Sequence, residues 1–94
     1  MPRHLIEKIR DAIRTGNYDM SQHAVDEMAE DNLRIADVES AVLTGEVVRK
    51  QIDDPRGTKY VIQGLCSVQS TTVGVVGRFK ETGVFLIITV YAIK

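Results

Sequence analysis

The spacing of apolar positions divides the chain into a helical first half and a strand-rich second half. Over residues 3–15, apolar side chains recur every three or four positions, which predicts an amphipathic helix. The same spacing predicts helices over residues 22–31 and 35–43, and Ser21 is a suitable N-cap for the first of these two. Residues 18–20 fit either a very short strand or an extended link. The side chains of these two helices expected to face the core are Ala24, Val25, Met28, Ala29, Ile35, Val38, Ala41 and Val42.

From about residue 46 onward, apolar and polar residues alternate, which predicts strands. The sequences between them favour turns: residues 53–57, a polar connection over residues 67–70, and a hairpin loop around residues 81–83. Short consecutive turns favour an antiparallel meander with helices on one face. The predicted fold is therefore α+β, with N-terminal helices packed on a four-stranded antiparallel meander sheet. The predicted strands are residues 47–52, 59–66, 71–80 and 84–93.

The last predicted strand is apolar on both faces, a pattern typical of a central strand that is covered on both sides. Simple alternation places Ile87, Thr89 and Tyr91 on one face together with Phe85. The hairpin loop decides where Arg78 lies. A two-residue loop pairs Arg78 with Ile87 and puts it on the Tyr91 face, whereas a three-residue loop turns it to the other face.

The composition is typical of one globular domain. All 94 residues are expected to form it, with residues 1–17 extending a core of residues 18–94, and 44% of the chain is apolar. No signal peptide is visible, and the longest apolar run, residues 84–93, is too short to span a bilayer as a helix. The single cysteine fits a reducing compartment. We therefore expect a cytoplasmic protein of bacterial type, with no membrane partner.

The net charge of −1 conceals an uneven distribution. Residues 1–18 carry four basic and two acidic side chains (+2), residues 19–46 carry one and eight (−7), and residues 47–94 carry seven and three (+4). One interpretation is two solvated surfaces of opposite sign. The other is a basic sheet surface that binds phosphates, because clustered cations raise the local concentration of anions.

His23 is the strongest candidate for acid–base chemistry. In the first turn of a helix, the amide dipoles disfavour a cationic imidazole and leave it able to accept a proton. Asp26 and Glu27, three and four residues further on, favour the cation instead, so burial decides between the two effects. The alternative is a half-buried structural histidine that hydrogen-bonds the neighbouring strand and fixes the entry of the helix.

Side chains of the predicted sheet supply the other candidates. Arg78 and its cationic neighbours are suited to bind a phosphate or to stabilise a pentavalent phosphorus centre, but solvated residues at a sheet edge look the same in sequence. Tyr91 is suited to stack on a base or donate to a phosphate, and its alternative is the rim of the core. The predicted substrate-binding residues are Arg49, Lys59, Lys80 and Thr89.

The sequence predicts no metal site and no cofactor. The imidazole and thiol groups available as ligands belong to His4, His23 and Cys66, which are not at ligand spacing. The glycines of residues 74–77 lie inside a predicted strand rather than in a phosphate-binding loop that opens a helix. No nucleotide cofactor is therefore implied.

A series of short motifs in fixed order resembles the bacterial DUF4258 family over about residues 18–92. It begins with Ser21-Gln22-His23-Ala24 through Met28, and it ends with Ile87-Ile88-Thr89-Val90-Tyr91. Between these lie Leu33, Asp37-Val38, Gly45 and Val47-Val48. That family is grouped by resemblance with the RelE, barnase and EndoU-like fold of small ribonucleases and toxins.

The resemblance implies metal-independent cleavage of RNA. A general base takes the 2′-hydroxyl proton, cations stabilise the phosphorane, and an acid protonates the leaving oxygen. By position, His23 would be the base or the acid, and Arg78 and Tyr91 are further catalytic candidates by their place in the sheet. This chemistry requires the imidazole to open onto the same hollow as the cations of the sheet.

Two departures from the family pattern favour a second hypothesis. Glu27 and Asp31 stand where the family commonly has arginines, and anions near an RNA site oppose the approach of phosphates. The alternative is a catalytically inactive relative that acts as a protein-binding module, with its acidic helices docking an antitoxin or a regulator. An exposed edge strand would also allow two copies to form a homodimer.

Overall fold

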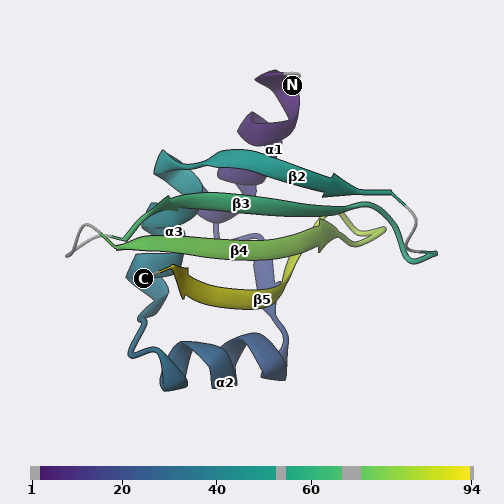
Figure 1. Ribbon diagram of the computed structural model, residues 1–94. Coiled ribbons are helices and arrows are strands. Elements are labelled where there is room, and N and C mark those ends of the chain that lie inside the picture. The colour runs from purple at the N-terminus through teal and green to yellow at the C-terminus, as the bar shows by residue number, and fades with distance from the viewer. Residues whose placement is uncertain (1–2, 53–54, 67–70, 94) are drawn as a thin grey trace.

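The computed structural model describes residues 3–52, 55–66 and 71–93 (Figure 1). The predicted turn over residues 53–57 is described only from Pro55 onward, and the predicted connection over residues 67–70 lies outside the described residues. The three predicted helices and the four predicted strands are all present, with ends within one residue of those expected. The helices are α1 (Arg3–Arg14), α2 (Gln22–Glu30) and α3 (Ile35–Thr44). The strands are β1 (Tyr18–Met20), β2 (Glu46–Gln51), β3 (Lys59–Leu65), β4 (Thr72–Phe79) and β5 (Phe85–Ile93).

The sheet has five strands in the order β1-β5-β4-β3-β2, so the prediction of a four-stranded antiparallel sheet is wrong in number and in type. Strands β2 to β5 form the expected antiparallel meander. The fifth strand is β1, which runs parallel to β5 and pairs Tyr18 with Phe85. Its three residues are too few to show a period of two, so the sequence pattern did not reveal this pairing.

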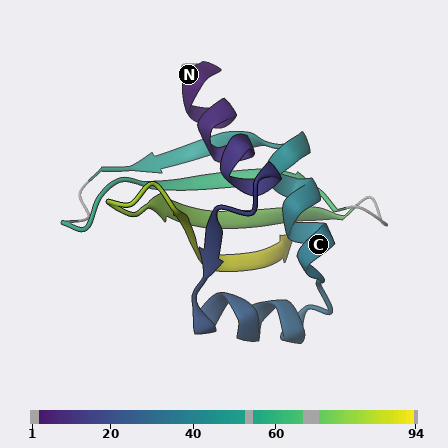
Figure 2. The same cartoon turned by 180° about the vertical axis from the view of Figure 1, so that it is seen from behind.

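The sheet carries helices on one face only. Helices α1 and α3 lie against that face, α2 runs along the β5 edge, and the described part of the chain leaves the opposite face uncovered (Figures 1 and 2). We call this opposite face the open face. The core lies between the helices and the covered face, and its largest fully buried side chains are Ile9, Val38, Val42, Ile62, Val73, Val75, Phe85, Ile87 and Val90.

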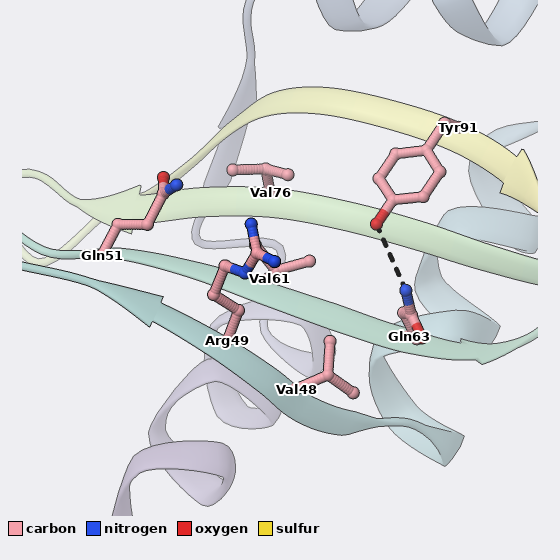
Figure 3. Close-up of a pocket in the computed structure, with 7 residues that line it drawn as sticks. All are labelled: Val48, Arg49, Gln51, Val61, Gln63, Val76 and Tyr91. Atoms are coloured by element: carbon pink, nitrogen blue, oxygen red, sulfur yellow. Dashed lines mark hydrogen bonds between the residues drawn. The ribbon is translucent and has the colours of Figure 1, made fainter.

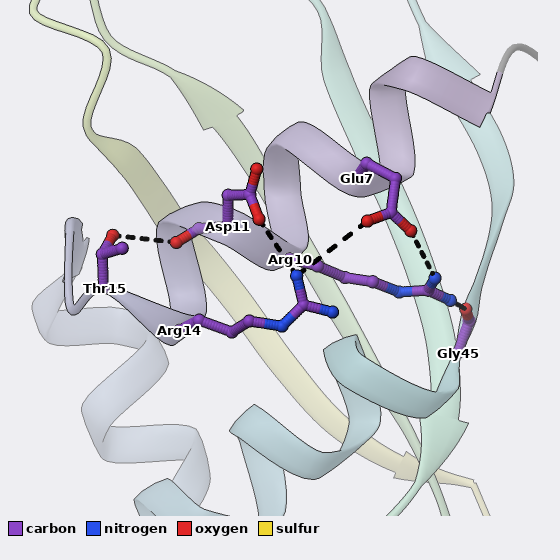
Figure 4. Close-up of polar contacts among 6 residues, drawn as sticks. All are labelled: Glu7, Arg10, Asp11, Arg14, Thr15 and Gly45. Atoms are coloured by element: carbon purple, nitrogen blue, oxygen red, sulfur yellow. Dashed lines mark hydrogen bonds and ion pairs between the residues drawn. The ribbon is translucent and has the colours of Figure 1, made fainter.

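Two of the helices meet the sheet at close range. A Cβ added to Gly64 of β3 would collide with the carbonyl oxygen of Ala41 in α3, so only glycine permits this approach. Arg10 of α1 donates from Nη2 to the carbonyl oxygen of Gly45 at 3.0 Å, and its Nη1 pairs with Glu7 at 3.1 Å (Figure 4). Both contacts fix the helices on the covered face.

Helix α2 buries a narrower stripe than predicted. Ala24 and Met28 are buried, but Val25 and Ala29, which the spacing placed inward, are exposed. The reason is that α2 packs along the side of β5 that extends past β1, rather than across the sheet, so only one side of it meets apolar neighbours. Ile35, at the start of α3, is likewise exposed instead of buried.

A β-bulge at Ile88 decides which side chains of β5 face the core. Val76 pairs with Thr89 and Gly77 pairs with Ile87, which leaves Ile88 as the extra residue. Ile87 is fully buried before the bulge and Val90 is fully buried after it. The prediction that Ile87 and Tyr91 share a face is therefore wrong, because the alternation changes phase between them. The prediction that this strand is covered on both sides is also wrong for the described chain.

The hairpin between β4 and β5 has a three-residue loop, residues 81–83, closed by Lys80 N donating to Val84 O at 2.8 Å. Arg78 consequently pairs with Leu86. In a regular strand this register would place Arg78 and Tyr91 on opposite faces. The bulge at Ile88 reverses that outcome and brings both side chains onto the open face.

Candidate functional site

Most of the predicted site residues lie on the open face. Arg49 pairs with Val61, Val61 with Val76, and Val76 with Thr89, so these four positions form one row across the sheet. A second row begins with Gln51, which pairs with Lys59 at the start of β3. The predicted site residues that the strand pairing places on this face are Arg49, Lys59, Arg78, Thr89 and Tyr91.

A hollow of about 480 Å³ opens on this face over β2, β3 and β4 (Figure 3). The guanidinium group of Arg49 extends from β2 into it, above the apolar side chains of Val61 and Val76 (Figure 3). Among the described residues, Arg49 has neither an ion pair nor a hydrogen bond through its side chain, so its charge is available to an anion. The remaining lining residues are Val48, Gln51, Gln63 and Tyr91.

Tyr91 lies flat at one end of the hollow. Its ring covers Gly74 of β4, where an added Cβ would collide with the ring atoms. Gln63 Nε2 donates a long hydrogen bond of 3.4 Å to the Tyr91 hydroxyl oxygen, which fixes the direction of the ring across β3 (Figure 3). Gly74, Gln63 and Gln51 were not predicted as site residues. Gly74 had a signal in the sequence, because a glycine inside a strand often marks a close approach.

Arg78 lines a second hollow, of about 490 Å³, near the β4–β5 hairpin. Lys80 lines it too, but Lys80 Nζ pairs with the Asp19 carboxylate at 2.9 Å, so part of its charge is already compensated. Arg78 makes no such pair with any described residue. The other lining residues are Pro55, Arg56, Phe79 and Glu81.

His23 lies away from both hollows, in the first turn of α2 at the sheet edge. Its side chain is 66% exposed, so it is not the half-buried structural histidine of the alternative interpretation. Nε2 lies 3.3 Å from Oε1 of Glu27, one helical turn further on. The contacts to the neighbouring strand are made by Ser21 instead, whose hydroxyl donates to Ile88 O at 2.9 Å and accepts from Ala24 N.

The three predicted catalytic residues therefore occupy three places. Arg78 and Tyr91 share the open face but line different hollows, and neither hollow includes His23. Among the described residues, His23 has one ion-pair contact, with Glu27. The structure thus places Tyr91 in one hollow with Arg49, and the expectation that the His23 imidazole opens onto a hollow lined by the sheet cations is not met.

Glu27 and Asp31 bind the edge of the sheet. Glu27 Oε1 accepts a hydrogen bond from Val90 N at 3.0 Å, and Asp31 Oδ2 accepts one from Ala92 N at 3.2 Å. These amides belong to the part of β5 that extends past the end of β1. The two carboxylates thus replace a neighbouring strand, and neither lines a hollow of the open face.

Much of the acidic charge in residues 19–46 is used inside the molecule. Besides Glu27 and Asp31, Asp37 accepts from Arg34 N at 2.9 Å, and Glu39 accepts from the Tyr18 hydroxyl at 2.8 Å. The cations of the open face are not compensated in this way at Arg49 and Arg78. The open face is therefore the part of the described surface best suited to hold an anion.

Among the described residues, no three His, Cys, Asp or Glu side chains gather as a metal site would require. No helix among them combines the length and the apolar character needed to cross a membrane.

The model of the family described as "Domain of unknown function (DUF4258)" matches residues 20–92. The chain belongs to the DUF4258 family. Comparison with curated proteins and with solved structures gave no match. The DUF4258 region begins in β1, includes α2, α3 and strands β2 to β4, and ends one residue before the end of β5. Every open-face residue named above lies within it, whereas α1 precedes it.

Proposed function

We propose that this DUF4258 protein binds single-stranded RNA on the open face and cleaves it without a metal ion, as a small toxin-like ribonuclease. The observation that carries the proposal is the pairing of an uncompensated cation, Arg49, with an aromatic ring, Tyr91, in one hollow of an uncovered sheet. Cations that track phosphates and aromatic rings that stack on bases are the two elements of single-strand binding. Helices α2 and α3, followed by a mainly antiparallel sheet, also suit the RelE-like fold that we propose for the chain.

In this proposal, Arg49 and Arg78 bind successive phosphates, and charge-assisted hydrogen bonds from a guanidinium stabilise the phosphorane as negative charge develops. Lys59 on β3 and Thr89 on β5 lie on the same face and would add to the surface that the RNA contacts. Lys80, paired with Asp19, contributes at the hairpin end.

Because His23 lines neither hollow, it would act as the general base only on RNA that passes from the open face over the sheet edge beside α2. In the neutral imidazole with its proton on Nε2, the nitrogen that lies 3.3 Å from Glu27 Oε1, Nδ1 is the nitrogen left to accept the 2′-hydroxyl proton. Glu27 is itself held by Val90 N, so the imidazole is oriented from the sheet. Glu27 would then position His23, and its carboxylate would not need to contact the phosphates.

Binding and cleavage are tested separately, with purified protein and a labelled single-stranded RNA in the presence of a chelator. Arg49→Gln is expected to weaken binding and to lower the slope of log affinity against log salt by about 0.7, the value of one phosphate contact. Lys50→Gln is the matched control, because Lys50 is the next residue of β2 and pairs with Tyr60 on the covered face. His23→Ala is expected to abolish cleavage and leave binding unchanged.

Three results would count against the proposal. The first is that RNA does not bind, and the second is that Lys50→Gln weakens binding as much as Arg49→Gln. The third is cleavage that survives in His23→Ala or stops when divalent ions are removed, which would retire the histidine mechanism.

A second candidate function is a catalytically silent protein-binding module. The observation that favours it is the exposure of large apolar side chains on the two acidic helices: Val25 on α2, and Ile35 and Leu43 on α3. The partner would be an antitoxin or a regulator, or a second copy pairing along the exposed edge strand β2. Loss of partner binding in Ile35→Asp, with no change in Arg49→Gln, would favour this function over the first.

A further inference from the structure

We propose that Tyr91 and Gly74 form a nucleobase subsite, in which one base of a single-stranded RNA stacks on the outer face of the Tyr91 ring. This inference rests on the proposed function, because it gives the RNA-binding face a defined position for a base. One face of the ring lies on the backbone of Gly74. Figure 3, which views the hollow from the open side, shows the ring nearly face-on, so its other face is directed away from the sheet.

The ring is held in an orientation suited to stacking. Only glycine at position 74 lets the ring lie flat, since a Cβ there would lift it off the strand. The hydrogen bond from Gln63 Nε2 to the hydroxyl restrains rotation of the ring out of this position. A fixed aromatic face costs little entropy when a planar ligand binds.

Apolar side chains surround this end of the open face. Val48 lines the hollow with Tyr91 and is 52% exposed. The row next to Gly74 and Tyr91 consists of Leu65, Thr72 and Ile93, in which Thr72 pairs with both of the others. Leu65 is 51% exposed and Ile93 is 38% exposed. An exposed apolar rim favours a base over a bare phosphate, because the base buries its faces against it.

The cations lie toward the opposite end of the same face. Arg49 is one row along from Tyr91, and Arg78 is one row further, beyond Val76 on β4. A strand with its base on Tyr91 would therefore carry its phosphates past Arg49 toward Arg78. The base must be unpaired, because in a duplex both of its faces are stacked on its neighbours.

Polar groups for the edge of the base are present beside the ring. Gln63 donates to Tyr91 through Nε2, and its side-chain oxygen has no partner among the described residues. The Gln51 amide lines the same hollow. An amide supplies both a donor and an acceptor, so these two side chains are suited to contact the hydrogen-bonding edge of the stacked base.

The test compares an oligoadenylate with an abasic ribose-phosphate strand of the same length and charge, each titrated with the full chain by fluorescence anisotropy. Tyr91→Leu is expected to weaken oligoadenylate binding on the order of 10-fold, the effect of losing one stacked base, and to leave abasic binding unchanged. Tyr91→Phe keeps the ring and is expected to retain most of the affinity. Gly74→Ala is expected to behave like Tyr91→Leu, because the ring is displaced.

The outcomes separate this inference from the proposed function. If the two strands bind equally well, or if Tyr91→Leu weakens both alike or neither, the subsite is refuted while RNA binding stands. If neither strand binds, both proposals fall. Circular dichroism shows whether each variant is folded. If Gly74→Ala is unfolded, the result with Tyr91→Leu alone decides the inference.

Discussion

Glu27, on α2, caps the backbone of β5: its Oε1 accepts a hydrogen bond from the amide of Val90 at 3.0 Å. Asp31, one turn along the helix, does the same for Ala92 at 3.2 Å. The amides of an edge strand attract other strands unless they are covered, and natural proteins often cover them with a helix. Here the covering helix also supplies the acceptors, so α2 is attached to the sheet by polar as well as apolar contacts.

Glu27→Ala is expected to destabilise the protein by about 1–2 kcal/mol, because it removes a charged acceptor from a backbone amide that water reaches poorly. Glu27→Gln keeps an acceptor oxygen and should cost less. The measurement is urea unfolding followed by circular dichroism. The matched control is Asp26→Ala, on the same helix, whose exposed carboxylate accepts a hydrogen bond from the Gln22 side chain rather than from the sheet. Equal losses in the two alanine variants would contradict the edge-cap interpretation.

Stability is expected to fall at high pH because of Tyr18. The pKa of Tyr18 is raised from 10.0 to about 12. Burial is the largest cause, followed by the hydrogen bond to Glu39 and the negative charge of Glu39. Below pH 10 the phenol is protonated in both the folded and the unfolded state, so its contribution is fully present. Between about pH 10 and 12 the unfolded chain loses this proton and the folded chain keeps it, so stability is lost as pH rises.

The measurement is a near-ultraviolet titration of phenolate absorbance, in which one tyrosine of the folded protein should ionise near pH 12. Tyr18→Phe removes this late step and also the 2.8 Å hydrogen bond to Glu39, at a cost of about 1 kcal/mol at neutral pH. If Tyr18 of the folded protein titrates near pH 10, the effect assigned to its burial and to Glu39 is wrong.

Gly64→Ala is expected to cost about 1–3 kcal/mol or more, since the added methyl group meets the backbone of α3 at Ala41 and the helix must move. Thermal unfolding checks this value. Gly57→Ala measures backbone strain without a contact, because an added Cβ there has no neighbour within 4 Å but its φ of +124° is unfavourable for alanine. A loss below about 1 kcal/mol at Gly64 would contradict the close contact between α3 and β3.

Gly74→Ala should also destabilise the protein, but by a different route, because the obstacle is the Tyr91 side chain rather than backbone. Truncating that side chain should therefore relieve the strain. We expect Gly74→Ala to cost less free energy of unfolding in a Tyr91→Leu background than in the natural sequence, as a double-mutant cycle measures. Strict additivity would show that the ring does not lie on Gly74.

The elements with a long, regular period were predictable from sequence, and the features that arrange the site were not. Residues 22–31 and the four long strands carry enough repeats for the period to be recognised. β1 has three residues, and its parallel pairing with Phe85 depends on the path of the chain after α1. The covering role of Glu27 and Asp31 was also hidden, since a carboxylate that bonds a distant amide looks like any solvated acid.

The types of residue in the candidate site could be predicted from the sequence, but which of them lie together could not. Arg49, Arg78 and Tyr91 were identified as cations and an aromatic ring of the sheet, and they do lie on one face. The common face of Arg78 and Tyr91 depends on the bulge at Ile88, which the strand sequence does not reveal because both of its faces carry apolar residues. The separation of His23 from them follows from the position of α2 at the sheet edge, which the helical period does not report.

The extra residue at Ile88 also decides how the chain would respond to a change of length at this point. Deleting Ile88 would remove the bulge and leave Ile87 and Thr89 opposite Gly77 and Val76, so Val90 would stay in the core and Tyr91 on the open face. A deletion between Thr89 and Tyr91 would instead turn the tyrosine toward the helices, because no unpaired residue there absorbs the change. Relatives that are one residue shorter at Ile88 are therefore expected to keep the aromatic platform.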